Sequence, residues 1–156
     1  MNSNLTFTYE GIDDLANCLR SGLNGYAVTE SQHGRLTSIW LFMCDEVLQI
    51  QSNITTVHDW EEVGTLHFRC VTENEPLPEK ILIPLSWLKI SSVSLLQLEE
   101  NDFRAQCGIA LSNTKGSSLI MVSGALPMTV ELQAEFYKND FQPEYEIKRY
   151  SKIEMK

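Results

Sequence analysis

The sequence lacks several features that define whole classes of protein. No apolar run approaches the roughly eighteen residues that a membrane-spanning helix needs, since stretches such as SLIMVSGAL are far shorter. The first residues, MNSNLTFTYEG, contain no basic segment followed by an apolar stretch, so we expect no secretory signal. The four cysteines form no C-x-x-C pair, which argues against both a zinc ribbon and a dense disulfide framework. Together these absences predict a cytoplasmic protein with reduced cysteines and no membrane association.

Basic side chains are scarce in the first two thirds of the chain. Residues 1–100 carry 14 acidic and 5 basic side chains, whereas residues 101–156 carry 7 of each. The whole net charge of −9 therefore arises before residue 101. Proteins that bind nucleic acid draw affinity from Lys and Arg side chains that neutralise phosphates, so this composition predicts no nucleic-acid partner. A basic protein partner is compatible with it.

Motifs that carry catalysis or bind phosphate are also missing. The stretch IALSNTKGSSLIMVSG, residues 109–124, is rich in Gly and Ser, but Lys115 precedes Gly116, whereas the lysine of a phosphate-binding loop follows its glycine. We expect a hairpin turn there instead, because Asn113 and Gly116 both tolerate a positive φ. Ser123 lacks the preceding glycine of the G-x-S-x-G signature. We accordingly expect no catalytic residue, no metal and no cofactor.

One stretch keeps an enzymatic alternative open. In VHDWEEVG, residues 57–64, His58 is surrounded by carboxylates that would raise its basicity, as in a general base or a metal site. Adjacent residues of a strand point to opposite faces, so a solvated turn anchored by Trp60 is the favoured interpretation. A metal-dependent hydrolase centred on His58 remains the least favoured of three functional hypotheses.

The features that are present indicate one globular domain, residues 1–156. A chain of this length with 43% hydrophobic residues can bury a core of its own. Residues 11–23 place Ile12, Leu15, Leu19 and Leu23 on one helical stripe, with Gly22 and Gly25 as stop signals, and predict an amphipathic helix. No second helix is predicted.

From Leu36 onward, short alternating segments separated by turn residues predict strands. Residues 36–52 predict a hairpin that turns at Asp45 and Glu46, and residues 73–84, with three prolines, predict a connecting loop that leads to an edge. Further strands are predicted over 64–72, 90–99, 102–111, 129–136 and 145–153. The alternation in 102–111 predicts a single inward face made by Phe103, Ala105, Cys107, Ile109 and Leu111, and the alternation in 129–136 predicts a solvent-exposed face that includes Glu131. The unbroken apolar run 119–122 predicts a central strand, covered by the helix at 11–23. The expected fold is α+β: one N-terminal helix and a mostly antiparallel, curled sheet of six to eight strands.

In a simple up-and-down sheet the acidic residues would form two rims, one at each end of the strands. The first would contain Asp45, Glu46, Glu73, Glu75 and Glu79. The second, together with two tryptophans, provides the predicted partner-binding residues Asp59, Trp60, Glu61, Glu62, Trp87, Glu99, Glu100 and Asp102. For both tryptophans core packing is favoured, and Trp87 is the better candidate for exposure because it adjoins the proline-rich loop. Such a rim can attract a cationic partner.

The favoured functional hypothesis is therefore a non-catalytic cytoplasmic interaction module that binds a protein, as inhibitor or immunity-type proteins do. The acidic charge is compatible with a basic protein as that partner. The alternative is a small-molecule-binding β-barrel or cupped sheet, whose ligand would lie near Trp40 or Trp60. An enclosed pocket lined by Trp40, Phe42 and Phe68 would favour this alternative. The sequence leaves the oligomeric state open.

Overall fold

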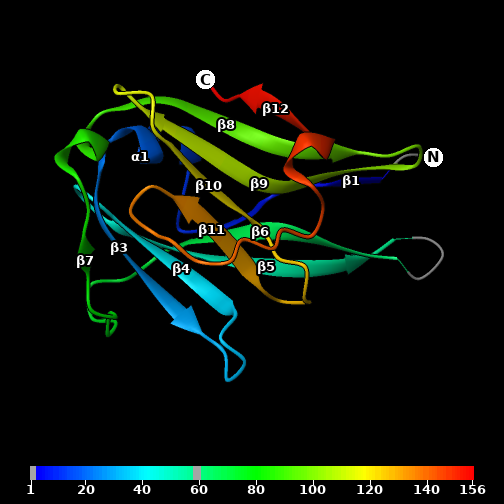
Figure 1. Ribbon diagram of the computed structural model, residues 1–156, viewed down its shortest axis with the longest axis horizontal. Coiled ribbons are helices and arrows are strands. Elements are labelled where there is room, and N and C mark those ends of the chain that lie inside the picture. Colours follow the sequence, from blue (N-terminus) through cyan, green and yellow to red (C-terminus); the bar gives the residue numbers. More distant parts are fainter. Residues whose placement is uncertain (1–2, 58–60) are drawn as a thin grey trace.

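The computed structural model describes residues 3–57 and 61–156. Within them the chain is mainly β-strand, with one short α-helix and two 3-10 turns (Figure 1). The elements are β1 (Ser3–Leu5), β2 (Thr8–Glu10), α1 (Leu15–Arg20), β3 (Leu23–Glu30), β4 (Leu36–Met43), β5 (Val47–Thr56), β6 (Glu62–Cys70), β7 (Ile81–Leu82), η2 (Leu85–Leu88), β8 (Ile90–Glu99), β9 (Phe103–Asn113), β10 (Ser118–Ser123), β11 (Val130–Ala134), η3 (Ile147–Arg149) and β12 (Tyr150–Glu154).

The described strands join into one mixed sheet in the order β12-β8-β9-β10-β11-β4-β5-β6-β2, from which β1, β3 and β7 branch. The α+β class is confirmed, but the expected six to eight strands were too few. The strands β1, β2 and β7 are only two or three residues long, too short for alternation to reveal them. The strand β3 was missed because Asn24 and Gly25 resemble a helix stop. A Cβ at Gly25 would lie 2.9 Å from the backbone oxygen of Ile81 on the neighbouring strand β7, so a glycine suits this position.

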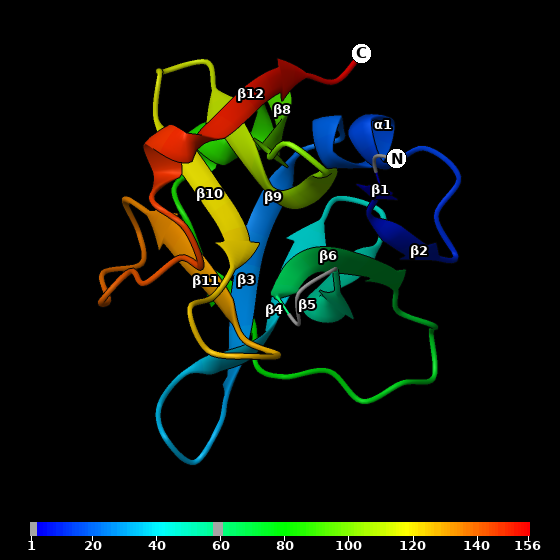
Figure 2. The same cartoon turned by 90° about the vertical axis from the view of Figure 1, so that its right-hand side faces the viewer.

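The sheet curls, and the N-terminal segment links its two halves (Figure 2). The strand β1 pairs in parallel with β9, and β2 pairs in parallel with β6. Phe7, between them, is buried; its backbone N–H donates to Gln106 Oε1 at 2.7 Å and its ring lies 5.0 Å from that of Phe68. The two parallel pairs make the sheet mixed, although its longer ladders are antiparallel.

The predicted helix is shorter than expected. It begins after Asp14, whose side chain accepts a hydrogen bond from Asn17 N at 3.1 Å, and ends before Gly22, which has φ +105°. Six residues remain, with Leu15 and Leu19 buried. The helix packs chiefly against β8, and not against β10 as expected.

The hairpin of β4 and β5, the strand β6 and the central position of β10 are confirmed. The strand β10 lies between β9 and β11. Leu119, Met121 and Val122 are fully buried, as the apolar run predicts, whereas Ile120 of the same run is half-buried. The turn before it is also confirmed: Gly116 has φ +84°, and Asn113 Oδ1 accepts the N–H groups of Lys115 and Ser117, both at 3.0 Å.

A bulge divides β9 between two core clusters. Leu96 pairs with Gly108 and Gln97 pairs with Gln106, so Cys107 is an extra residue on β9. Phe103, Ala105 and Cys107 consequently pack in one cluster, while Ile109 and Leu111 pack in the other. The predicted single inward face for these five residues was therefore wrong, because an inserted residue reverses the alternation that follows it.

Two predictions near the C-terminus also need correction. Glu131, expected on a wet face of β11, is buried; it pairs with Arg35 at 2.6 Å and accepts the N–H of Gln142 at 2.6 Å. The predicted strand 145–153 begins instead with the 3-10 turn η3, so β12 starts only at Tyr150. The segment between β11 and β12 runs beside the end of β10, where the Glu144 N–H donates to Ser123 O at 2.9 Å and Gly124 pairs with Pro143.

Candidate functional site

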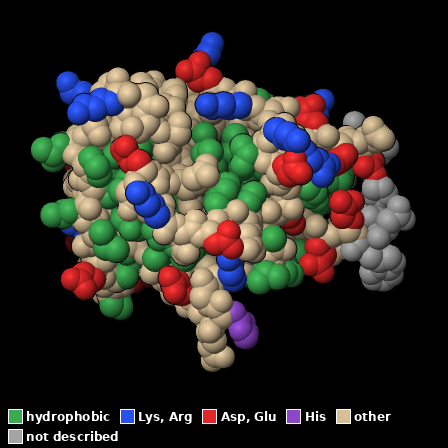
Figure 3. All heavy atoms as spheres, viewed as in Figure 1, with side chains coloured by type: hydrophobic (Ala, Val, Ile, Leu, Met, Phe, Trp, Pro, Cys, Tyr) green, Lys and Arg blue, Asp and Glu red, His purple; other side chains and the backbone are tan. Residues whose placement is uncertain are grey.

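Two hairpin tips lie at the same end of the molecule. The turn between β8 and β9 and the adjoining ends of β5 and β6 are on the right in Figure 1 and face the viewer in Figure 2. Acidic side chains gather on this side in Figure 3, interspersed with a few cations. We call the carboxylates of these tips the acidic end: Glu61, Glu62, Glu99, Glu100 and Asp102. Glu61, Glu62 and Glu99 are exposed, and the other two are half-buried.

The segment 145–149 holds the two tips together. Tyr145 Oη donates to Glu61 Oε1 at 3.3 Å, and Arg149 forms an ion pair with Glu100. The Arg149 guanidinium lies over the Tyr145 ring, 4.8 Å from its centroid. This chain of contacts connects residues of the β5–β6 tip with residues of the β8–β9 tip, so the acidic end is one surface, although its parts are far apart in the sequence.

The remaining predicted partner-binding residues are placed as follows. Asp59 and Trp60, with His58, lie outside the described residues. Trp87 is fully buried, at 0% exposure, and its Nε1 donates to Glu135 Oε1 at 3.1 Å. Core packing, the favoured placement for Trp87, is therefore confirmed, and a fully buried ring is not available to a partner: η2 inserts it into the main core cluster, where it meets Phe136 edge-on.

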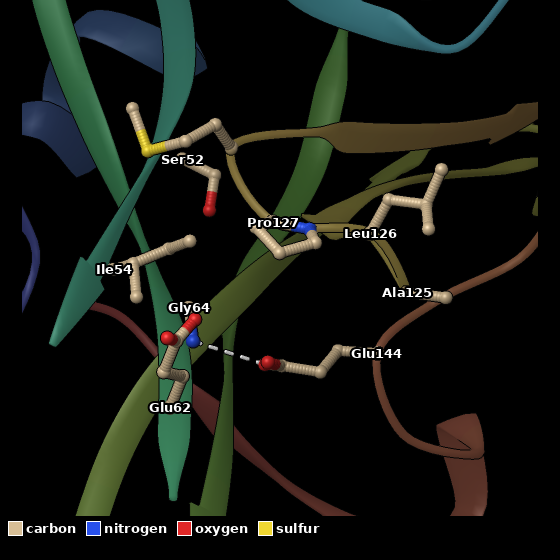
Figure 4. Close-up of a pocket in the computed structure, with 10 residues that line it drawn as sticks. Ser52, Ile54, Glu62, Gly64, Ala125, Leu126, Pro127 and Glu144 are labelled. Carbon is tan, nitrogen blue, oxygen red and sulfur yellow. Dashed lines mark hydrogen bonds between the residues drawn. The ribbon is translucent and has the colours of Figure 1, made fainter. Parts of the chain in front are cut away.

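A hollow of about 200 Å³ adjoins the acidic end (Figure 4). We call it the Glu144 hollow; it is lined by Ser52, Ile54, Glu62, Gly64, Gly124, Ala125, Leu126, Pro127, Met128 and Glu144. Glu144 Oε1 accepts hydrogen bonds from the backbone N–H of Gly64 at 3.0 Å and from Ser123 Oγ at 3.2 Å. In Figure 4 the carboxylates of Glu62 and Glu144 point toward the same space beside Gly64.

Burial raises the pKa of Glu144 above its ordinary value, and the nearby charges of Glu61 and Glu62 raise it further. The hydrogen bonds from Gly64 and Ser123 oppose this shift. A carboxylate that is dehydrated beside other carboxylates gains most from a cation. No Lys or Arg among the residues that the structure describes forms an ion pair with Glu144.

Other acidic residues lie elsewhere on the sheet. Asp45, Glu46 and Glu73 line a hollow of about 320 Å³ at the β4–β5 turn. Glu75, expected at the same rim, pairs with Arg69 at 2.7 Å, which lowers the pKa of Glu75. This region carries part of the first rim that the sequence predicted.

Two thiols share one carboxylate beside this hollow. Cys18 Sγ donates to Glu46 Oε1 at 2.7 Å, and Cys70 Sγ donates to Glu46 Oε2 at 3.0 Å. Burial and the Glu46 carboxylate raise the pKa of Cys18 to about 12 and that of Cys70 to about 11. Metal binding requires thiolates, which this arrangement disfavours. In the described part of the chain, no group of three or more His, Cys, Asp or Glu side chains could hold a metal ion.

The aromatic residues invoked for a small-molecule site are packed into cores. Phe68 is fully buried in the main cluster, while Trp40 and Phe42 pack with Ala27 in a separate small cluster. Trp40 Nε1 is also satisfied, because it donates to Thr29 Oγ1 at 3.0 Å. Both the apolar ring and the N–H of Trp40 therefore have partners within the protein.

Sequence reasoning missed Glu144, Tyr145 and Arg149. They lie in residues 101–156, where acidic and basic side chains balance, and the stretch carries no motif. Their position depends on the path of the loop between β11 and β12, which is set by tertiary contacts such as the pairing of Gly124 with Pro143. No local signal in the sequence could have placed them beside Glu61 and Gly64.

No protein-family model, no curated protein and no solved structure matches this chain. Across residues 3–57 and 61–156, no helix has the length and apolar character to span a membrane.

Proposed function

We propose that this chain is a non-catalytic interaction module of the cytoplasm that binds a basic protein through its acidic end. The observation that carries the proposal is the link from Glu61 through Tyr145 and Arg149 to Glu100. It makes one charged surface from two hairpin tips. A pre-organised surface loses less conformational entropy on binding than two independent loops would.

The charge of the chain supports a basic partner and disfavours nucleic acid. At −9 the protein repels phosphate backbones over several ångströms and attracts cations. The cysteines Cys18, Cys44, Cys70 and Cys107 are free, which is the state that a reducing cytoplasm maintains.

The test uses fluorescein-labelled hexalysine as the basic probe and fluorescence anisotropy as the readout. The variant E99K/E100K reverses two charges of the acidic end, and D45K/E73K makes the same change in net charge at the β4–β5 turn. We expect E99K/E100K to weaken binding about tenfold and D45K/E73K to weaken it much less. Wild-type affinity should fall as ionic strength rises from about 0.02 M to about 0.15 M.

Equal losses in the two variants would mean that only the overall charge matters. Affinity that ignores both salt and E99K/E100K would likewise contradict the acidic end as a binding surface.

A further inference from the structure

The Glu144 hollow combines a polar floor with an apolar lip. Its floor contains the Glu144 carboxylate, the Gly64 backbone and Ser52, while its lip is the turn of residues 125–128. Leu126 and Met128 on this lip are 51% and 57% exposed. Glu144 is half-buried. Aliphatic side chains exposed beside a half-buried carboxylate suit a ligand that has both an apolar stem and a charged head.

The floor is held in place by hydrogen bonds. Gly64 N–H and Ser123 Oγ both donate to Oε1 of Glu144. The backbone N–H of Glu144 in turn donates to Ser123 O at 2.9 Å. No donor from the described residues reaches Oε2. Glu144 therefore presents one free oxygen to the hollow, beside the carboxylate of Glu62.

Hydrogen bonds also hold the lip in place. Thr129 donates twice to Leu126 O, from its N–H at 3.3 Å and from Oγ1 at 2.6 Å, and Gly124 N–H donates to Thr129 O at 2.8 Å. Met128 adopts φ +64°, a conformation that is uncommon for a residue with a side chain. These contacts hold the Leu126 and Met128 side chains at the mouth of the hollow.

We propose that the Glu144 hollow receives the ammonium group of a lysine side chain from the basic partner, with the methylene stem of that lysine against Leu126, Pro127 and Met128. This inference rests on the proposed function, which supplies the partner. Lysine fits better than arginine because Glu144 Oε1 already accepts two hydrogen bonds. The carboxylate cannot then offer both oxygens to the two-pronged guanidinium. An ammonium can donate separately to Glu144 Oε2 and to Glu62.

The raised pKa of Glu144 adds a pH dependence to this binding. The carboxylate is partly protonated near its raised pKa, and the lysine ammonium binds only the ionised form. Hexalysine binding should therefore strengthen as pH rises through the pKa of Glu144. Glu144 accepts hydrogen bonds from the Gly64 N–H and the Ser123 hydroxyl, and Glu61 and Glu62 are nearby charges. The titratable groups of Cys107, Tyr145 and Tyr150 also interact electrostatically with Glu144.

The test compares the binding of hexalysine and of hexaarginine to the 156-residue chain, with amide NMR as the readout. The Gly64 N–H is a direct reporter because it donates to Glu144. We expect hexalysine to shift this signal and hexaarginine to shift it less. E144Q should weaken hexalysine binding about fivefold and change hexaarginine binding less than about twofold. The control variant E154Q, an exposed carboxylate on β12, should change neither.

A second variant guards against a folding defect in E144Q. Leu126→Ser alters only an exposed lip residue and should weaken hexalysine binding about twofold to threefold. If neither E144Q nor Leu126→Ser affects hexalysine, or if both peptides respond equally, the lysine site is wrong. The proposed function survives that result as long as E99K/E100K still weakens both peptides, and it fails separately if E99K/E100K has no effect.

Discussion

The backbone N–H of Gly64 donates to Oε1 of Glu144 at 3.0 Å, although the two residues are 80 positions apart in the chain. This contact connects the loop before β12 with the beginning of the strand β6. It explains why the hollow and the bridge from Tyr145 to Glu61 occur together: a single segment, residues 144–149, supplies both. A partner that meets the acidic end therefore meets the Glu144 hollow as well.

Gly64 tolerates no side chain at this contact. A Cβ there would lie 2.7 Å from Ser123 Cβ and 3.0 Å from Ser52 Oγ. We expect Gly64→Ala to lower the free energy of unfolding by about 1–3 kcal/mol, the usual range for overpacking. Urea denaturation monitored by fluorescence measures it.

The double variant Gly64→Ala/Ser123→Gly is the matched control, because it removes the Cβ that the new methyl group would meet. It should recover part of the loss, so the two substitutions should not be additive. Additive losses would show that the clash with Ser123 is not the cause.

Glu144→Gln should change how stability depends on pH. The folded-state pKa of Glu144 is raised above its unfolded value, so the folded state binds the proton more tightly. The contribution of this group to stability is then fully present below the unfolded pKa and is lost as pH rises through the folded pKa. Glutamine stays neutral and keeps an oxygen for Gly64. We expect the stability of E144Q relative to the wild type to increase as pH rises from below the ordinary glutamate pKa of 4.5 through the raised folded-state pKa of Glu144. A difference that stays constant over this range would contradict the raised pKa.

The thiols should react with iodoacetamide in a definite order. Cys44 is exposed, whereas Cys18 and Cys70 donate to Glu46 and have raised pKa values of about 12 and about 11. Alkylation requires the thiolate, so Cys44 should be modified first, as mass spectrometry of peptides would show. Glu46→Gln removes the negative charge and should accelerate Cys18 and Cys70. Cys107, buried in another cluster, serves as the internal control, and acceleration there as well would indicate unfolding.

The regular strands were predictable because the alternation of apolar and polar residues is a local pattern in the sequence. The alternation of Leu66, Phe68 and Cys70 identifies β6, and the run from Leu119 to Val122 identifies the centre of the sheet. The bulge at Cys107 was not predictable, because an inserted residue is defined by its partner strand and the partner's register is not written in the sequence of β9.

The candidate site was predictable only in part, for a related reason. Glu61, Glu62, Glu99 and Glu100 follow from the placement of turns between strands, and they do lie at hairpin tips. Glu144 and Arg149 do not follow, since their positions depend on a loop whose path is set by tertiary contacts. Trp87 lies in the core, as the favoured prediction had it, so the nearby prolines did not bring its ring to the surface.

The most direct test of the proposed acidic end is an amide NMR titration of the wild-type protein with hexalysine. We predict that signals from Glu61, Glu62, Glu99 and Glu100 shift together, saturate with one common affinity and lose that response as salt is added. Shifts that concentrate at Asp45 and Glu73, or that spread evenly over the acidic residues, would contradict the acidic end as the binding surface.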